Sequence, residues 1–395
     1  MVACGGARRL EQVEKGIVLV ALVVSGERTI VAPEEVIDTP AMVVDEAILH
    51  RNIAEMQSFA ASVGVAMRPH AKTHKTPQIA RLQLAAGAVG VTCAKVGEAE
   101  VFVDEGGVDD VLLAYPVVGE PKIRRLLSLM ERAHLTVAVD THEAAIALSD
   151  AMTANERVLD LYIEVNTGQD RAGVLAGEEA VALARELARM PGLRPVGVMT
   201  HEGHAGASSP AEIAETAVNA GRALVATAAA IRAEGIPIDH VSVGSTPSSR
   251  FTPTVPGVTE MRPGTYVFND NNAFRHGAIG PDRCAARVVA TVVSRSAPSR
   301  AIVDAGSKAL AYDPSPSHPG HGYVVGHPAA TIVRISEEHG VVLLPDGEAG
   351  FAVGDRVEII PNHVCPTINL TDQLYVVRAG RVVDVWPVAA RGKVR

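Results

Sequence analysis

The chain has 395 residues, which is too long for one ordinary hydrophobic core and predicts two domains, or one large barrel with an appendage. Hydrophobic residues make up 47%, charged residues 21% and aromatic residues only 3%, so the core is predicted to be aliphatic, as in proteins with buried parallel strands. The formal net charge of −9 leaves no basic patch and argues against nucleic-acid binding.

The cysteines and the N-terminal segment both point to the cytoplasm. The four cysteines lack the spacing of a disulfide framework and are interpreted as reduced thiols. The apolar run Ile17–Val24 is too short to span a bilayer, and glutamates surround it without a convincing cleavage site. We therefore expect no membrane association. Residues 1–36 are interpreted as an extension that contributes a strand to the C-terminal domain, or in part as an over-long translation start. The cysteines are Cys4, Cys93, Cys284 and Cys365.

From about residue 38, short aliphatic runs alternate with amphipathic stretches. Asp45–Ser62, Glu178–Met190 and Ala211–Ala233 have apolar residues at helical spacing. The predicted strands between the helices are Val65–Arg68, Gly90–Ala94, Val111–Ala114, Leu135–Asp140, Leu161–Val165, Val196–Thr200, His240–Val243 and Met261–Phe268.

Eight strands in alternation with helices predict a parallel sheet, and eight is the number that closes into a (β/α)8 TIM-type barrel. A doubly wound open sheet is the alternative, but the Gly-x-Gly-x-x-Gly phosphate loop after a first strand is missing. The fold class is therefore α/β, with a barrel over residues 37–275.

In the last third of the chain, residues 276–395, the alternation of strand-like and helical segments ends. The short β-branched segments of this part are separated by Gly, Pro or Asp, which predicts an all-β domain without long helices. The predicted strands are Ala286–Val293, Arg300–Asp304, Thr331–Ile335, Val341–Leu344, Arg356–Ile360, Gln373–Val377 and Val382–Pro387.

The end of the first barrel strand carries two lysines and two histidines, within Arg68–Lys75. Active sites of such barrels lie at the strand C-termini. Lys72 could form an imine with an aldehyde cofactor, because desolvation lowers an ammonium pKa and frees the amine. Lys75, near the start of a helix, is expected to be a solvated capping charge instead.

Small and hydroxyl residues follow strand seven, at Gly244–Ser248, and lie within the predicted strand eight, at Gly264–Tyr266. Such segments are the usual phosphate site of a barrel, because bare backbone N–H groups can approach an anion there. Each alone is more often a simple turn. Together with a lysine after the first strand they predict a phosphate-bearing cofactor.

These motifs resemble the fold-type III pyridoxal-phosphate (PLP) enzymes, the alanine racemase-like group, and within it the D-threonine aldolase and D-serine dehydratase branch. The resemblance rests on Asp38–Ala41, on Arg68–Lys75 and on Pro361–Thr367, and it extends over residues 37–392. It implies a barrel followed by a β-domain, a small D-amino acid substrate and a homodimer.

The resemblance also implies roles for individual residues. Lys72 matches the lysine that carries PLP as a Schiff base, and Arg171 matches an arginine near the phenolic oxygen of the cofactor. Arg262 resembles the arginine that faces the pyridine nitrogen in alanine racemases, where a cation keeps the ring unprotonated and a weaker electron sink. The residues that match the phosphate cradle are Gly244, Ser245, Thr246, Gly264, Thr265 and Tyr266.

His363 and Cys365 are the candidate metal ligands. On an extended segment, residues i and i+2 point the same way, so imidazole and thiolate could grip one cation. Two ligands alone are a weak signal, but this segment resembles the metal site of the branch. A thiolate favours Zn²⁺, with Mn²⁺ or Mg²⁺ as alternatives.

His201 and His204 follow strand six, where a general base could reach a substrate hydroxyl. Hydrogen bonding within a loop is their alternative role. Glu338 and His339 could complete the site of a neighbouring subunit, although surface residues are the default interpretation.

The reaction that the resemblance implies is cleavage of D-3-hydroxy amino acids to glycine and an aldehyde, with PLP and a divalent metal. Cys365 leaves a D-serine dehydratase open, because aldolases of the branch often have Asp at this position. A non-catalytic PLP-binding protein is a third possibility, against which the β-domain counts.

Overall fold

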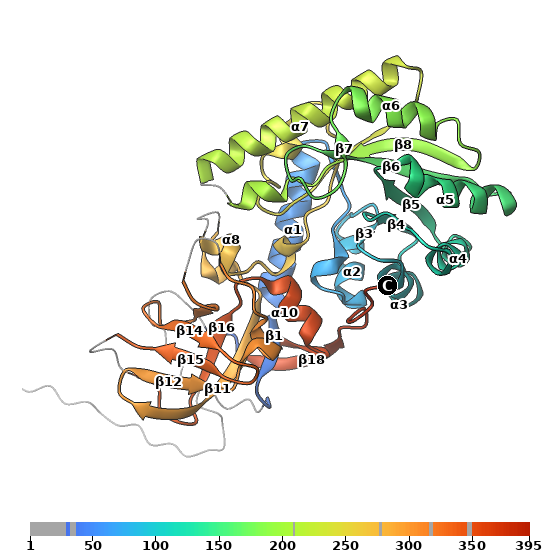
Figure 1. Cartoon of the computed structure of the whole chain (residues 1–395). Coiled ribbons are helices and arrows are strands. Elements are labelled where there is room, and N and C mark those ends of the chain that lie inside the picture. Colours follow the sequence, from blue (N-terminus) through green and yellow to red (C-terminus); the bar gives the residue numbers. More distant parts are fainter. Residues whose placement is uncertain (1–28, 32–36, 208–209, 276–278, 316–318, 346–349) are drawn as a thin grey trace, which may run out of the picture.

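The computed structural model describes residues 29–31, 37–207, 210–275, 279–315, 319–345 and 350–395. They form two β-sheets (Figure 1), one ringed by helices and one, at lower left, that is mostly antiparallel. No helix within these residues is both long and apolar enough to cross a membrane.

The first sheet is a parallel barrel. Its strands lie in the order β2-β10-β9-β8-β6-β5-β4-β3. The ring closes where β2 meets β3, through a parallel bridge of His70 with Thr92 and an N–H···O bond of 2.8 Å from Thr92 to Pro69. The eight strands are β2 (Ala66–Met67), β3 (Val91–Cys93), β4 (Asp110–Leu113), β5 (His134–Val139), β6 (Leu159–Asn166), β8 (Leu193–Met199), β9 (His240–Val243) and β10 (Glu260–Met261). The predicted (β/α)8 class is confirmed.

Helices follow the strands as the apolar periodicity predicts. Asp45 is the N-cap of the first helix rather than its first residue, because its carboxylate accepts the N–H of Ile48 at 2.9 Å. A short strand, β7 (Val174–Leu175), pairs with the end of β6. The helices are α1 (Glu46–Ser62), α2 (Pro77–Ala85), α3 (Val96–Gly106), α4 (Glu120–Leu129), α5 (His142–Ala154), α6 (Glu178–Leu187), α7 (Pro210–Ala233) and α8 (Asn271–Arg275).

The eighth strand is much shorter than predicted. It ends at Met261, and Thr265–Val267 form a 3₁₀ turn instead of continuing the strand. Pro263 has no N–H to donate to a ladder, and its carbonyl accepts the N–H of His70. A β-carbon at Gly264 would lie 2.7 Å from Thr73 Oγ1, so only glycine permits the chain to turn this close to the Lys72 segment.

The second sheet contains all seven predicted strands, one short strand that was not predicted (β13) and one strand from before the barrel. β1 (Ala41–Asp45) pairs antiparallel with β11 and parallel with β17, so it belongs to this sheet although the predicted boundary at residue 37 assigns it to the barrel. The strands are β11 (Ala286–Ala297), β12 (Arg300–Val303), β13 (Tyr323–Val324), β14 (Thr331–Ile335), β15 (Gly340–Leu343), β16 (Arg356–Ile360), β17 (Gln373–Arg378) and β18 (Arg381–Pro387).

Two short helices lie among these strands, α9 (Ser307–Leu310) and α10 (Val364–Leu370). The extended conformation expected for His363–Cys365 is wrong, because His363 is the residue before α10 and Cys365 is inside it. α10 packs against the 3₁₀ turn Ala71–Thr73 of the barrel. In Figure 1 it lies on the side of the second sheet that faces the barrel.

Most of the predicted N-terminal extension lies outside the described residues. Ile30 and Val31 are described, and both donate their N–H groups to the buried carboxylate of Glu358, at 2.8 and 3.0 Å. The same carboxylate accepts from Arg287 at 2.8 Å, and both side chains of this ion pair are buried. One buried carboxylate thus neutralises a buried arginine and binds an incoming chain segment.

Replacing Glu358 with Ala should lower the free energy of unfolding by about 3–5 kcal/mol, because it leaves the Arg287 charge buried without this carboxylate. Chemical denaturation followed by circular dichroism measures the loss. Glu338, whose ion pair with Lys308 is exposed, is the control. Glu338→Ala should leave the denaturation midpoint almost unchanged, and equal losses for the two variants would contradict the interpretation.

Candidate active site

Two adjoining cavities of about 370 and 360 Å³ open at the C-terminal ends of the barrel strands. His70, Lys72, His201 and Arg262 line both of them. Burial lowers the pKa of Lys72 and outweighs the nearby Cys365, which acts in the opposite direction. The amine is therefore more readily available as a neutral nucleophile than that of an ordinary lysine.

The turn that carries Lys72 is held by its neighbours. His70 Nδ1 accepts the backbone N–H of Lys72 at 3.4 Å. The expectation of a solvated Lys75 is wrong, because its buried ammonium donates to Glu98 at 2.9 Å. The Lys75 carbonyl accepts the N–H of Ala390, so the end of the chain also fastens this turn. The sequence gives no local sign of Glu98, which is brought here by α3.

The predicted phosphate cradle assembles only in part. Four of its residues line the first cavity: Ser245, Thr246, Gly264 and Thr265. The Tyr266 side chain is buried elsewhere, with its hydroxyl bonded to Gln83 at 2.9 Å, and only its N–H turns to the cradle, where Thr246 Oγ1 accepts it at 3.2 Å. Gly244 lines the second cavity instead of the first.

Gly244 is held from both ends by the segment after β8. Its N–H donates to Glu202 Oε2 at 3.2 Å and its carbonyl accepts from His201 Nδ1 at 2.5 Å. Glu202 is fully buried, and its other oxygen accepts the Ser248 hydroxyl at 2.7 Å. Glu202 therefore shapes the cradle loop. Sequence reasoning missed it, although it lies between the two histidines that were considered.

The two predicted histidines have different positions. His201 lines both cavities, and burial together with Lys72 lowers its pKa to about 3, so its ring is neutral with Nε2 as an acceptor. His204 lines neither cavity, and its ring packs on Gly168. The structure therefore brings His201, and not His204, to Lys72.

The two arginines lie around the second cavity. Arg262 is buried and donates to Ser242 Oγ and, at 2.6 Å, to the Thr200 carbonyl. Arg171 follows β6, and its side chain remains 54% exposed, with Glu164 at 3.9 Å as its ion-pair partner. Both cations therefore border the space next to Lys72.

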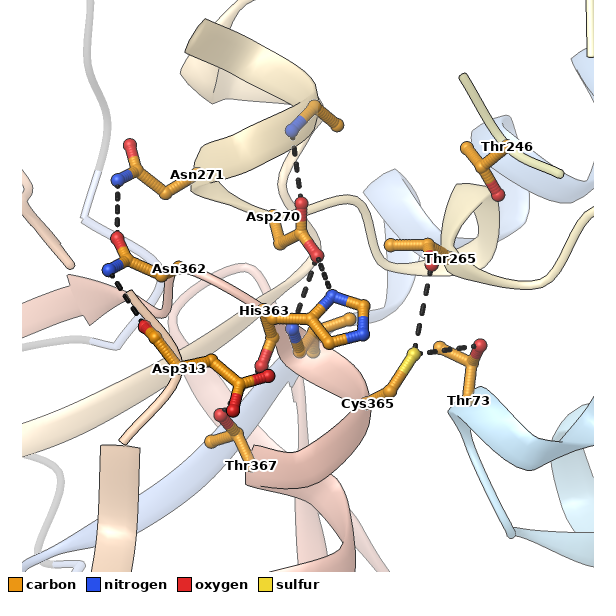
Figure 2. A network of polar contacts seen from close by, with 12 residues as sticks. Thr73, Thr246, Thr265, Asp270, Asn271, Asp313, Asn362, His363, Cys365 and Thr367 are labelled. Atoms are coloured by element: carbon orange, nitrogen blue, oxygen red, sulfur yellow. Dashed lines mark hydrogen bonds and ion pairs between the residues drawn. The ribbon is translucent and has the colours of Figure 1, made fainter. Parts of the chain in front are cut away.

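His363 and Cys365 meet at the wall of the first cavity (Figure 2). Cys365 Sγ lies 3.2 Å from Thr73 Oγ1 and 3.7 Å from Thr265 Oγ1. His363 Nδ1 donates to the buried carboxylate of Asp270 at 3.2 Å, which leaves Nε2 for another ligand. The role of Asp270 as the partner of His363 was not predicted from the sequence.

The two side chains form a charged pair. Burial opposes it, but Cys365 and Asp270 raise the pKa of His363 to about 11. Burial raises the pKa of the Cys365 thiol, yet His363 and Thr73 outweigh it and leave that pKa below its ordinary value. Within the described residues no cluster of three or more His, Cys, Asp or Glu side chains could hold a metal, so a cation here would have two protein ligands.

Comparison with known proteins agrees with this geometry. Residues 44–272 match the family model described as alanine racemase, N-terminal domain, and residues 285–377 match the putative serine dehydratase domain. A D-threonine aldolase of Arthrobacter sp. is 36% identical over 359 residues, covering 90% of this chain and 93% of the relative. The chain belongs to the fold-type III PLP enzymes. It lies in their D-threonine aldolase and D-serine dehydratase branch.

Solved structures of this branch superimpose over nearly the whole chain. The D-threonine aldolase from Filomicrobium marinum has a TM-score of 0.85 and 38% identity, with 91% of this chain and 97% of that chain covered. The D-threo-3-hydroxyaspartate dehydratase from Delftia sp. HT23 has a TM-score of 0.83 and 34% identity, with 89% and 97% covered. An aldolase and a dehydratase thus have the same architecture as this PLP enzyme.

Replacing His363 with Ala should raise the pH at which Cys365 becomes reactive, because the imidazolium that lowers the thiol pKa is lost. The measurement is the alkylation rate against pH in metal-free protein, read at Cys365 by peptide mass. Cys93 and Cys284 should stay slow, since burial raises the pKa of both thiols. His339→Ala, at an exposed histidine, is the control variant. An unchanged profile for His363→Ala would disprove the pairing.

Proposed function

We propose that this protein is a PLP- and divalent-metal-dependent aldolase that cleaves D-3-hydroxy amino acids of the D-threonine type to glycine and an aldehyde. One observation carries the proposal. Lys72, four residues of the predicted anion cradle and the His363–Cys365 pair all line a single cavity. The names of the similar aldolases supply the substrate class.

The residues present fit PLP. Lys72 would hold it covalently, and the hydroxyls and glycine of Ser245, Thr246, Gly264 and Thr265 would hold its phosphate. When bound, PLP supplies an electron sink for the bond that breaks at the α-carbon. A β-carbon on Gly264 would collide with the Lys72 segment. The cradle can therefore lie directly against this segment only because residue 264 is a glycine.

The His363–Cys365 pair fits a divalent cation, for which Zn²⁺, Mn²⁺ and Mg²⁺ are the candidates. Asp270 accepts the Nδ1–H of His363, so loss of the Nε2 proton on metal binding would leave Nε2 and the Cys365 thiolate as the two donors. With two protein ligands, the remaining positions are open to water and substrate, as in catalytic sites. A cation there supplies a Lewis acid for the 3-hydroxyl group.

His201 would be the histidine that takes the hydroxyl proton. Its Nδ1 is committed to the Gly244 carbonyl, so Nε2 is the free acceptor in the cavities. Its ring is neutral, so Nε2 can accept a hydrogen bond from the hydroxyl group, although burial and Lys72 lower its basicity in the protein without substrate. His204, which lines neither cavity, has no comparable position.

A dehydratase is the second candidate, favoured by the Cys365 ligand. One solved structure is a cysteine-to-alanine variant of the Delftia dehydratase in its metal-free form, and another is a histidine-to-alanine variant. The two altered residues of that dehydratase stand two positions apart, as His363 and Cys365 do. A dehydratase would release ammonia and a 2-oxo acid, whereas an aldolase releases glycine and an aldehyde.

The unaltered protein with PLP and Mn²⁺ or Zn²⁺ should convert D-threonine to acetaldehyde and glycine, and should leave L-threonine unchanged. Lys72→Ala should lower kcat by roughly 10³-fold or more, as the loss of a covalent catalytic group commonly does. Chromatography of products from D-threonine and D-serine decides the reaction. Pyruvate and ammonia from D-serine, without glycine from D-threonine, would establish the dehydratase instead.

Asp270→Asn should weaken metal affinity by about 10- to 100-fold, because the ligand His363 loses its orienting carboxylate. Titration of apoprotein with Zn²⁺ or Mn²⁺ measures it. Asp313→Asn is the matched control, since Asp313 is exposed and its backbone carbonyl accepts from Asn362, the residue before His363, at 3.2 Å. Equal metal affinity for the two Asp variants would refute the role of Asp270.

His363→Ala should abolish activity while the yellow colour of bound PLP persists.

The homodimer and the cytoplasmic location are inferred from the family resemblance and from the cysteine pattern. Glu338 and His339, on the surface of the second sheet, remain candidates for completing a partner site. Sedimentation of the purified protein measures the subunit number.

A further inference from the structure

A buried carboxylate in the second cavity has no role in the proposal above. Glu164, near the end of β6, is only 5% exposed and lines the cavity beside Lys72 and His201. The side-chain carboxylate of Glu164 makes no hydrogen bond with the described residues, and burial raises its pKa. A carboxylate in this state is costly unless a partner compensates it.

The cation next to Glu164 is Arg171, with an Nη2–Oε1 distance of 3.9 Å. The loop that carries Arg171 has a fixed backbone, because Asn166 Oδ1 accepts the N–H groups of Gly168 at 2.9 Å and of Asp170 at 3.2 Å. The long side chain has no such restraint and is half exposed to solvent. Its ion pair with Glu164 is the interaction that draws it toward the cavity.

The other guanidinium of the cavity does not need Glu164. Arg262 donates to Ser242 and to the Thr200 carbonyl, and Ser242 in turn donates to the carboxylate of Glu260 at 2.5 Å. Arg262 is therefore oriented from within the barrel. Glu164 thus acts on Arg171, which has no other anchor among the described residues.

We propose that Glu164 is a positioning residue whose buried carboxylate turns the Arg171 guanidinium out of solvent and toward the ring oxygen of bound PLP. Arginine suits this task, because its planar fork can serve a carboxylate and a second acceptor at once. The proposal rests on the PLP part of the proposed function and not on the bond that is broken.

Glu164→Gln, which keeps the size and removes the charge, tests it. The dissociation constant of PLP from apoprotein should rise about 3- to 10-fold, the cost of ordering one long side chain on binding. The absorbance of bound PLP should shift toward the shorter-wavelength, neutral-phenol form. Glu164→Asp, which keeps the charge, should retain most of the long-wavelength band.

A double-mutant cycle separates positioning from a direct role. Arg171→Gln should reproduce both effects, and Glu164→Gln combined with Arg171→Gln should be no worse than Arg171→Gln alone. Additive effects would show that Glu164 acts on PLP without Arg171, and would overturn the proposal. An unchanged spectrum and affinity in Glu164→Gln would also overturn it.

Asp160→Asn is the matched control. Asp160 is buried on the same strand, at the opposite end, and pairs with Arg194 at 2.6 Å. It should leave the spectrum and the PLP affinity unchanged. Neither readout requires turnover, so an unaltered protein that binds PLP at Lys72 but releases no glycine overturns the proposed reaction and not the role of Glu164.

Discussion

The contact between α10 and the Ala71–Thr73 turn is the constraint on which the site depends. It places Cys365 Sγ 3.2 Å from Thr73 Oγ1, one residue from Lys72, although 292 positions separate Thr73 and Cys365. The Ala390 N–H, donated to the Lys75 carbonyl, fastens the same turn from the second sheet. The amine comes from the barrel and the thiolate from the other unit, so neither unit alone contains the cavity described here.

The barrel interior shows how charge is tolerated next to this cavity. Arg68 binds Asp110 at 2.6 Å and Glu260 at 2.7 Å, and Glu260 continues through Ser242 to Arg262. Each of these buried charges has a partner of opposite sign or a hydrogen bond, which offsets much of the desolvation cost. The chain of contacts ends at the cavity wall, where it fixes the direction of the Arg262 guanidinium.

The features that could be predicted from the sequence are those that depend on a local pattern of residues. The aliphatic runs placed all eight barrel strands, with His240–Val243 matching to the residue, and the lysine motif singled out Lys72, which lines both cavities. The sequence alone could not reveal contacts between residues that are far apart along the chain. β1 joins the second sheet across the whole barrel, and the carboxylates of Glu202, Glu164 and Asp270 take their roles from partners that only folding brings near. The turn at α10 was missed because a His-x-Cys spacing fits an extended segment equally well.

Two bases of different kind share the cavities, and this bears on the choice of reaction. Lys72 has a lowered pKa, whereas His201 is neutral and held through Nδ1. Removal of the hydroxyl proton leads to carbon–carbon cleavage, and removal of the α-proton leads to loss of the hydroxyl group. A cation held by His363 and Cys365 would assist either outcome, so the presence of a cation site does not by itself decide between them. The proposed aldolase needs a base for the hydroxyl proton, and His201, held through Nδ1 with Nε2 free, would be that base.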